Sequence, residues 1–469
     1  MTEAVCPGCR ERDLLIAALQ QQVAALEARV RELEQRLNQN ASNSSLPPSH
    51  NPPQAPKPVV KKPTGRKPGG QPGHPGPLRL RLPPEQLKAV IPLVPSHCQR
   101  CHAPLPAQAG PDDPEPTWQQ VAELPAQLVE VTEYQGHGRR CSCCGEVTWQ
   151  PLPAAVRAHA QGPRLTAALA YLSGRHHVSK RGLVEIATDL FGVPLGLGTV
   201  SNLEQQMSQA LAPAHTQIQQ AVQQAPVKHV DETGWKRAGK PVWLWAAATA
   251  TLACFVIYPS RGLAGLTALL GNVIRGVVCS DRWSAYGRLL VRRRQLCWAH
   301  LKRDFQKCVD RGGAARAVGQ AGLAAVAQVF ETWHSFRGGG LDRAGLQARL
   351  PTLRRDLRHA LVKGSGGADK KVARFCRNLL RLYPALWTYA RVAGVEPTNN
   401  HVERVLRRGV LWRKNSFGCH SEAGCRFVER MLTVVQTLRL QQRPVLEYLH
   451  QALVAQRAAG PAPKLLPSG

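Results

Sequence analysis

Three acidic residues stand at the edges of apolar segments and span more than 170 positions of the chain: Asp231, Asp281 and Glu403. Carboxylate oxygens are the ligands that hard divalent cations prefer in proteins. A pair of such cations can activate a water and stabilise a leaving oxygen. We therefore interpret the three acids as one metal site that two strands and a helix must assemble.

The first two acids lie in segments that predict strands. In VKHVDETGW, residues 227, 229 and 231 alternate with residues 228, 230 and 232. This period of two places Asp231 near the C-terminal end of a strand and turns Glu232 to the opposite face. The short apolar run Val277 to Cys279 precedes Asp281, as in a buried strand that delivers a side chain to an active-site rim.

The third acid lies in PTNNHVERVLRR, which predicts a helix. Thr398 or Asn399 can cap it. Its inward face would be formed by Val402, Val405 and Leu406, which leaves Glu403 on another face. Ordinary structural interpretations remain open at this point, because an aspartate at a strand end is commonly a turn residue and Glu403 can form a surface pair with Arg407.

Several sequence blocks resemble those of a known family. VDETGW, SDRWSAY, CWAHLKRDF and TNNHVERVLRRGVLWRKNSFGCHSEAG resemble the catalytic blocks of insertion sequence 66 family transposases, in the same order and at compatible distances. Upstream, NSSLPPS and GRKPGGQPGHPG resemble that family's linker, so the resemblance covers nearly the whole chain. Arg282-Trp283 and Asn399-Asn400-His401 depart from the commonest pattern, and neither departure removes an acid.

The resemblance implies an α/β ribonuclease-H-like core in which Asp231, Asp281 and Glu403 bind Mg2+ (or Mn2+), two ions per active site. It predicts a DDE transposase: an activated water hydrolyses a phosphodiester at an element end, and the freed 3'-hydroxyl attacks target DNA. The alternatives are a metal-dependent nuclease or integrase of the same fold, and a catalytically inactive dimeric zinc and helix-turn-helix DNA-binding protein. Accessory proteins encoded by the element are candidate partners, since members of the family commonly need them.

The charge of the chain agrees with a nucleic-acid partner. Lys and Arg total 61 against 31 acidic residues, a formal net charge of +30. Such an excess attracts phosphate without selecting a sequence, so we expect double-stranded DNA, at element ends and target, although charge alone does not separate DNA from RNA. The polar N-terminus MTEAVCPGCRERD lacks the apolar core of a secretory signal, and we expect a bacterial cytoplasmic, nucleoid-associated protein.

The longest apolar run, Val242 to Tyr258, is the one candidate for a membrane span in the sequence. It falls just short of the ~18 residues that a span needs. Thr249 and Thr251 interrupt it, and it is rich in strand-forming residues. We therefore predict two consecutive strands and no membrane partner. These strands would follow Asp231 directly, as a ribonuclease-H-like meander requires.

The N-terminal segment, residues 10–40, predicts a coiled coil. Ile16, Val23, Val30 and Leu37 recur every seven residues, and Leu19, Leu26 and Leu33 follow three residues later. This pattern favours a parallel homodimer, with an amphipathic helix docked on its own chain as the alternative. Residues 41–85 then form a disordered Pro/Gly-rich basic linker, whose TGRKPGG stretch is either a minor-groove arm or a solvated tether.

Two CxxC pairs predict a zinc-binding module over residues 86–152, and they are Cys98, Cys101, Cys141 and Cys144. The turn within each pair can direct both thiolates to one tetrahedral Zn2+. Val121 to Tyr134 could form a hairpin between the pairs, and Cys143 is a decoy ligand. A third pair, Cys6 and Cys9, lacks partners in its own segment and forms either an interchain zinc clasp or free thiols.

The rest of the chain predicts a helical region and a catalytic domain. Residues 160–225 form a helix-turn-helix-like DNA-binding region whose third helix, capped by Thr199, runs through Met207. Residues 226–415 form the catalytic domain, with a helical insertion at about 301–395. C-terminal helices (416–456) and a tail (457–469) follow. His300, in CWAH, is either a neighbour of the site or a satisfied core histidine.

Overall fold

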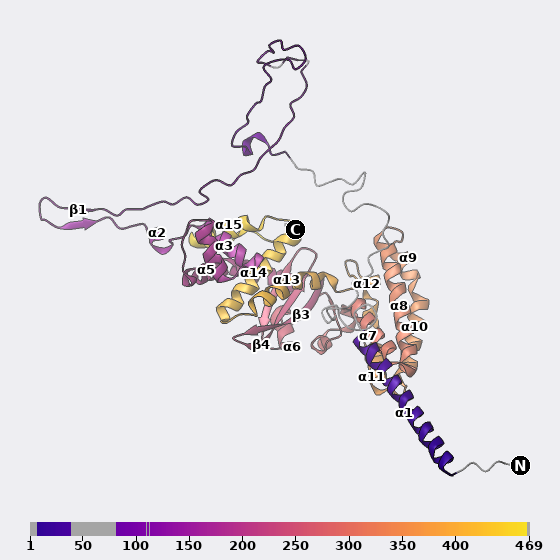
Figure 1. The fold of residues 1–469 in the computed structure, drawn as a ribbon. Helices are drawn as coiled ribbons and strands as arrows, with labels where there is room; N and C mark the ends of the chain where they lie inside the picture. Colours follow the sequence, from indigo (N-terminus) through magenta and orange to yellow (C-terminus); the bar gives the residue numbers. More distant parts are fainter. Residues whose placement is uncertain (1–6, 39–80, 109, 112, 467–469) are drawn as a thin grey trace. The chain divides into compact units, whose positions relative to one another are not determined.

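The computed structural model describes residues 7–38, 81–108, 110–111 and 113–466 (Figure 1). The chain divides into two compact units, residues 56–130 and residues 1–55 with 131–469. The boundary after Glu130 falls inside the predicted zinc-binding module. Most of the predicted linker, residues 39–80, lies outside the described residues, as does Cys6.

The larger unit is built around a five-stranded mixed sheet. Its strands are β3 (Val227–Arg237), β4 (Lys240–Ala248), β5 (Ala253–Tyr258), β6 (Val277–Ser280) and β7 (Arg294–Leu296). The order is β5-β4-β3-β6-β7, with β3, β4 and β5 antiparallel and β6 and β7 parallel to β3. The apolar run at 242–258 therefore forms strands, as predicted. In the described part of the chain, no helix is both long and apolar enough to cross a bilayer.

Helix α14 (Glu422–Leu440) covers the edge strand β5. Side-chain oxygens of Glu429, Thr433 and Thr437 accept hydrogen bonds from the amides of Ile257, Phe255 and Ala253, at 2.5, 2.9 and 3.0 Å respectively. Four residues of helix rise about 6 Å, close to the rise of two strand residues, so the helix can serve every second amide. These bonds satisfy edge groups that would otherwise be open to pairing with another chain.

The helical region shares its core with the sheet. Helices α3 (Pro163–His176), α4 (Lys180–Asp189) and α5 (Leu197–Gln224) form a three-helix arrangement as predicted. The predicted bounds of the third helix are wrong: it begins at Leu197 after Gly196 and continues to Gln224. It is long because its apolar positions continue beyond Met207 and enter the core that contains the sheet. Helix α15 (Val445–Arg457) packs on α3 and α5.

The segment between β7 and α13 is mainly helical, and its buried core also includes residues of β6 and β7. It contains α7 (Trp298–Arg311), α8 (Gly313–Arg337), α9 (Arg343–Ala348), α10 (Leu350–Ser365), α11 (Lys370–Arg381) and α12 (Thr388–Arg391). The glycine-rich stretches fall between α8 and α9 and at the end of α10, where helices must stop. The insertion leads from β7 to α13 (Asn400–Ser416), and it therefore separates the second acid from the third.

The remaining elements are short, apart from α1 (Pro7–Leu37), which is helical as predicted. Strands β1 (Gly138–Arg140) and β2 (Val147–Trp149) form an antiparallel hairpin around the second CxxC pair. The hairpin predicted at 121–134 is wrong, because that segment contains no strand. The other short helices are α2 (Ala154–Ala158), α6 (Leu263–Leu270), η2 (Pro84–Gln86), η3 (Ser284–Arg288), η4 (Val291–Arg293) and η5 (Tyr383–Leu386).

Candidate active site

Asp231 and Asp281 lie at the same level of two neighbouring parallel strands. The parallel register pairs Val227 with Val277 and His229 with Cys279. Two residues further, the same register brings Asp231 level with Asp281, just beyond the end of β6. Neighbouring strands are about 4.8 Å apart, and residues separated by two point to the same face. The sheet therefore places these two carboxylates side by side.

A buried arginine holds the backbone that carries Asp281. The guanidinium of Arg294 on β7 donates to the carbonyl oxygens of Asp281 (2.6 Å) and Tyr286 (3.1 Å) and to Oγ of Ser280 (3.1 Å). Burial lowers the pKa of Arg294 to about 10. Sequence reasoning missed Arg294. Its signal in the sequence is an arginine at the start of the short segment RQLC, which ends in two apolar residues.

Glu403 lies in the first turn of α13, as predicted. The helix buries Val402, Val405 and Leu406 against the sheet, while the Glu403 side chain stays 38% exposed. Gly409 allows a close approach, because a Cβ at this position would lie 2.4 Å from a methyl carbon of Leu244 on β4. The orientation of Glu403 thus follows from packing of the apolar face of α13.

Asn399 fixes the start of this helix to the strand that carries Asp231. The residue is the N-cap of α13, but its side chain makes no capping bond, so that part of the prediction is wrong. Its amide nitrogen instead donates to the carbonyl of Val230 (2.8 Å), and its amide oxygen lies 3.2 Å from Nδ1 of His229. Its backbone N–H donates to Sγ of Cys297 (3.2 Å). This completely buried residue joins three segments and sets the position of α13 relative to β3.

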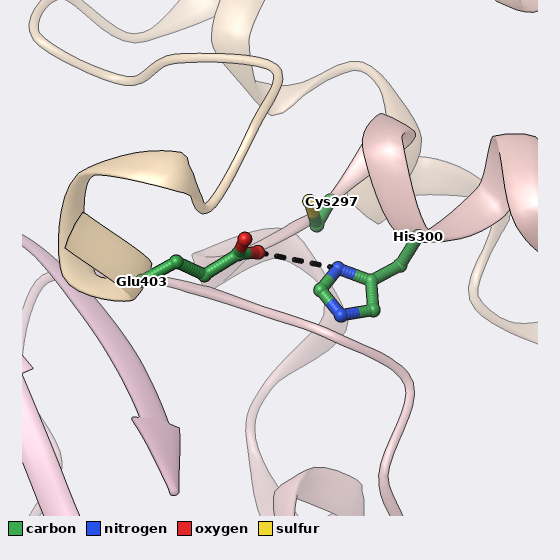
Figure 2. A group of neighbouring side chains, drawn as sticks. All are labelled: Cys297, His300 and Glu403. Carbon is green, nitrogen blue, oxygen red and sulfur yellow. Dashed lines mark ion pairs between the residues drawn. The ribbon is translucent and has the colours of Figure 1, made fainter. Parts of the chain in front are cut away.

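His300 is a neighbour of the site, so its interpretation as a satisfied core histidine is wrong. Figure 2 shows its ring beside the carboxylate of Glu403, with Nδ1 3.6 Å from Oε1. Both atoms are buried and have no hydrogen-bond partner among the described residues. The potential ligand atoms of Cys297, His300 and Glu403 all lie within 4.8 Å of one another.

The other two predicted acids act electrostatically on Asp231. The pKa of Asp231 is raised well above its usual value, first by burial and then by the negative charges of Glu232, Asp281 and Glu403. Several carboxylates close together disfavour full ionisation unless a cation compensates them. A divalent cation held by these oxygens would relieve this repulsion.

The donor atoms fit a hard cation better than a soft one. Asp231, Asp281 and Glu403 offer oxygen atoms, which suit Mg2+ or Mn2+. Oε1 of Glu403 is buried without a hydrogen-bond partner in the described structure, as expected of an oxygen reserved for a ligand. Burial raises the pKa of the Cys297 thiol to about 12, which disfavours the thiolate that metal binding requires. Cys297 therefore acts as a structural acceptor.

Glu232 has a different set of partners from Asp231. Its carboxylate accepts hydrogen bonds from the hydroxyl of Tyr286 (2.6 Å) and from Nε of Arg261 (3.0 Å). The Arg261 guanidinium also lies over the rings of Trp243 and Trp283, 4.7 and 3.9 Å from their centroids. Since Glu232 is buried in this network, replacing it would disturb the structure, and it is a poor control for the chemistry of Asp231.

The two CxxC pairs adopt matching local turns. The N–H of His102 bonds to the carbonyl of Cys98, and the N–H of Gly145 bonds to that of Cys141. Both turns have a positive φ at the residue after the second cysteine, 57° at His102 and 75° at Gly145. Backbone amides of Cys101 and Arg100 lower the pKa of Cys98, and those of Cys144 and Cys143 lower the pKa of Cys141. Each turn thus favours thiolates.

Comparison with known proteins identifies the family. The sequence profile described as Transposase IS66 family matches residues 159–426, which include all three acids. A family of unknown function (DUF6444) matches residues 5–79.

A relative from Sinorhizobium fredii (strain NBRC 101917 / NGR234), the uncharacterized protein y4qI, is 26% identical over 252 residues. The alignment covers 48% of this chain and 45% of the relative, so the chain spans about half the length of that relative. The family profile covers more than half of the chain, and on that basis the chain belongs to the IS66 family of transposases.

Proposed function

We propose that the protein is a DDE transposase that cuts the ends of an insertion element and joins the freed 3'-hydroxyl to target DNA. The observation that carries this proposal is the register that brings Asp231 level with Asp281, together with the raised pKa of Asp231, to which the charges of Asp281 and Glu403 contribute. Membership of the IS66 family supports the same reaction class.

The sheet supports a ribonuclease-H-like assignment for the catalytic domain. Three antiparallel strands are followed by two strands parallel to the first, in the order β5-β4-β3-β6-β7. The central strand β3 carries Asp231, and its parallel neighbour β6 leads to Asp281. Glu403 comes from a helix beyond the inserted helices, as the resemblance of the sequence blocks implies.

In this proposal Asp231, Asp281 and Glu403 hold two Mg2+ or Mn2+ ions. When bound, the ions supply the positive charge that activates the attacking oxygen and stabilises the leaving one. Attack of water on the scissile phosphate forms a new P–O bond and releases a proton from that water, while the bond to the 3'-oxygen breaks and that oxygen takes up a proton. In the second step the 3'-hydroxyl attacks a target phosphodiester, loses its proton and displaces the target's own 3'-oxygen.

The supporting residues maintain this geometry during both steps. Arg294 fixes the main chain of Asp281, and Asn399 fixes the start of α13 against β3. His300 lies against Glu403 and restricts the carboxylate to one side. We assign these three as positioning residues, because they act through the acids.

Two further parts of the proposal concern assembly. Matching turns with lowered thiol pKa values at Cys98 and Cys141 support structural Zn2+ bound by Cys98, Cys101, Cys141 and Cys144. The exposed heptad leucines and valines of α1 support a homodimer formed through a coiled coil.

The proposed reaction is tested with labelled DNA. Sequencing the DNA that flanks the gene supplies the inverted repeats, and a labelled duplex with such an end is incubated with the full-length protein, Mg2+ and a target plasmid. Cleavage at the repeat followed by transfer of the label to the plasmid is the expected result. Nicking without preference for the repeat would favour the nuclease alternative, and binding without cleavage would favour the non-enzymatic one.

A further inference from the structure

Four basic side chains meet where α3, α13 and α14 come together: Arg175, His177, Arg408 and Arg439. We call this group the basic junction. The last turn of α3 is pressed against α14, because a Cβ at Gly174 would lie 2.4 Å from the Met431 side chain. The ring of His177 lies 5.0 Å from that of Trp412 on α13.

The two arginines on the neighbouring helices point toward the same region. Arg408 precedes Trp412 by four residues, so the two side chains share a face of α13. Arg439 lies about two turns beyond Met431 on α14. The positive charges of Arg408 and Arg439 both act on Arg175 in the last turn of α3.

The basic junction has no negative partner within the described part of the chain. None of its three arginines forms an ion pair with a described carboxylate. Nε of Arg175 and both ring nitrogens of His177 are buried without a hydrogen-bond partner among the described residues. Buried polar atoms in native proteins nearly always have a partner, so a missing ligand or water is the usual explanation.

Helix dipoles account for only part of this arrangement. Arg175 lies in the last turn of α3 and Arg439 in the last turn of α14, where the negative end of a helix attracts cations. That attraction supplies no hydrogen bonds to the buried nitrogens. Burial and the charges of Arg175 and Arg408 lower the pKa of His177 to about 4, and Arg408 and Arg439 repel Arg175. An anion is the partner that would compensate the positive charge of the three arginines.

We propose that the basic junction binds a backbone phosphate of double-stranded DNA. Guanidinium groups recognise phosphate oxygens through paired hydrogen bonds, and an imidazole nitrogen can add another. Arg408 follows Glu403 by five residues, a rise of about 7.5 Å along α13. Five residues also turn the helix by about 140°, so Arg408 and Glu403 point to different sides of α13, and the proposed phosphate contact is separate from the three acids.

The proposal uses the proposed function only to identify the anion as a DNA phosphate, and its test requires no catalysis. Binding of the full-length protein to a labelled duplex of arbitrary sequence is measured by fluorescence anisotropy without divalent cations, from ~50 to ~200 mM KCl. The test variant is Arg175→Gln with Arg408→Gln. The matched control is Arg316→Gln with Arg374→Gln, which removes the same charge from exposed positions on α8 and α11.

We expect the test variant to bind about 10-fold more weakly than the control. The slope of log K against log salt should also become shallower, by about 0.9 for each phosphate that the variant no longer neutralises. Equal affinity and slope in the two variants would overturn the proposal. Circular dichroism and thermal unfolding check the fold. If the test variant does not fold, Arg439→Gln replaces it, because this exposed side chain can be changed without affecting the core.

Competitors distinguish the source of the phosphate. Unlabelled duplex DNA should displace the labelled duplex more effectively than double-stranded RNA of the same length, and stronger displacement by RNA would contradict the assignment to DNA. Failure of the proposed function has a different signature: wild-type protein would bind DNA through the basic junction but would neither cleave nor transfer an element end.

Discussion

Asp231 and Asp281 occupy matching positions on neighbouring parallel strands, two residues beyond the paired His229 and Cys279. The residues are 50 apart in sequence, yet the register alone brings their side chains to one face of the sheet. A slip of one residue in this pairing would turn one carboxylate to the opposite face. The geometry of the site therefore depends on the apolar residues that fix the register.

Replacing any one acid by its amide should abolish chemistry. Asp231→Asn, Asp281→Asn and Glu403→Gln each remove a negative ligand while keeping its shape. We expect end cleavage and strand transfer to fall on the order of 100-fold or more, the usual effect of losing one charge-stabilising group. Binding to DNA without divalent cations should persist. Glu331→Gln, at an exposed position on α8, is the matched control, and full activity after Glu403→Gln would show that the third acid is misassigned.

The substitution Asp231→Asn should also stabilise the metal-free protein. Because the folded-state pKa of Asp231 is raised, the ionised group opposes folding once the pH exceeds its unfolded value. The amide removes this cost, so thermal unfolding near neutral pH should shift upward by about 2–4 °C for each kcal/mol recovered. The shift should shrink as the pH falls toward the unfolded pKa. Mg2+ should stabilise wild-type protein more than the variant, and equal stabilisation would argue against a metal at Asp231.

Because α14 covers the edge strand β5, we predict that Thr433→Val lowers the stability of the fold. This nearly isosteric change removes the hydroxyl that accepts from the amide of Phe255 and leaves that buried N–H without a partner. The free energy of unfolding in urea should fall by about 1–3 kcal/mol. Thr332→Val is the control, since its hydroxyl bonds only to a carbonyl of its own helix. A similar loss in both variants would mean that the bond to β5 has no special role.

The coiled-coil proposal predicts that charge in the heptad seam prevents dimerisation. Leu26→Glu with Val30→Glu would place charges at d and a positions, and light scattering should then report a monomer. The control adds the same charge at the outward positions Gln21 and Ala28. A dimer of unchanged mass in the seam variant would assign assembly to another surface.

The zinc proposal predicts one tightly bound Zn2+ per chain in protein purified without chelator. Cys141→Ser should lose this metal, because a serine hydroxyl is a poor zinc ligand at neutral pH. Cys143→Ser should keep it, since Cys143 is the predicted decoy between two ligands. Metal content measured by atomic emission checks both variants. If Cys143→Ser loses zinc while Cys141→Ser keeps it, Cys143 is a ligand and Cys141 is not.

The sequence by itself determined most of the local elements and supplied the three acids as a hypothesis. Periodicity predicted β3, α13 and the strands at 242–258, because alternation and helical spacing are local properties that burial reinforces. The same reasoning predicted the helical insertion with its glycine-rich breaks. It failed for the bounds of α5, whose length depends on apolar contacts with a sheet that lies later in the sequence.

Only the tertiary structure decided which polar residues support the site. Arg294 bonds to a carbonyl 13 residues away, and Asn399 bonds to one 169 residues away. Arg175 and Arg408 of the basic junction are separated by more than 200 positions. No local sequence pattern marks such residues, because their roles come from hydrogen bonds and charges between distant segments. These segments come together only when the apolar faces of the helices and strands have packed.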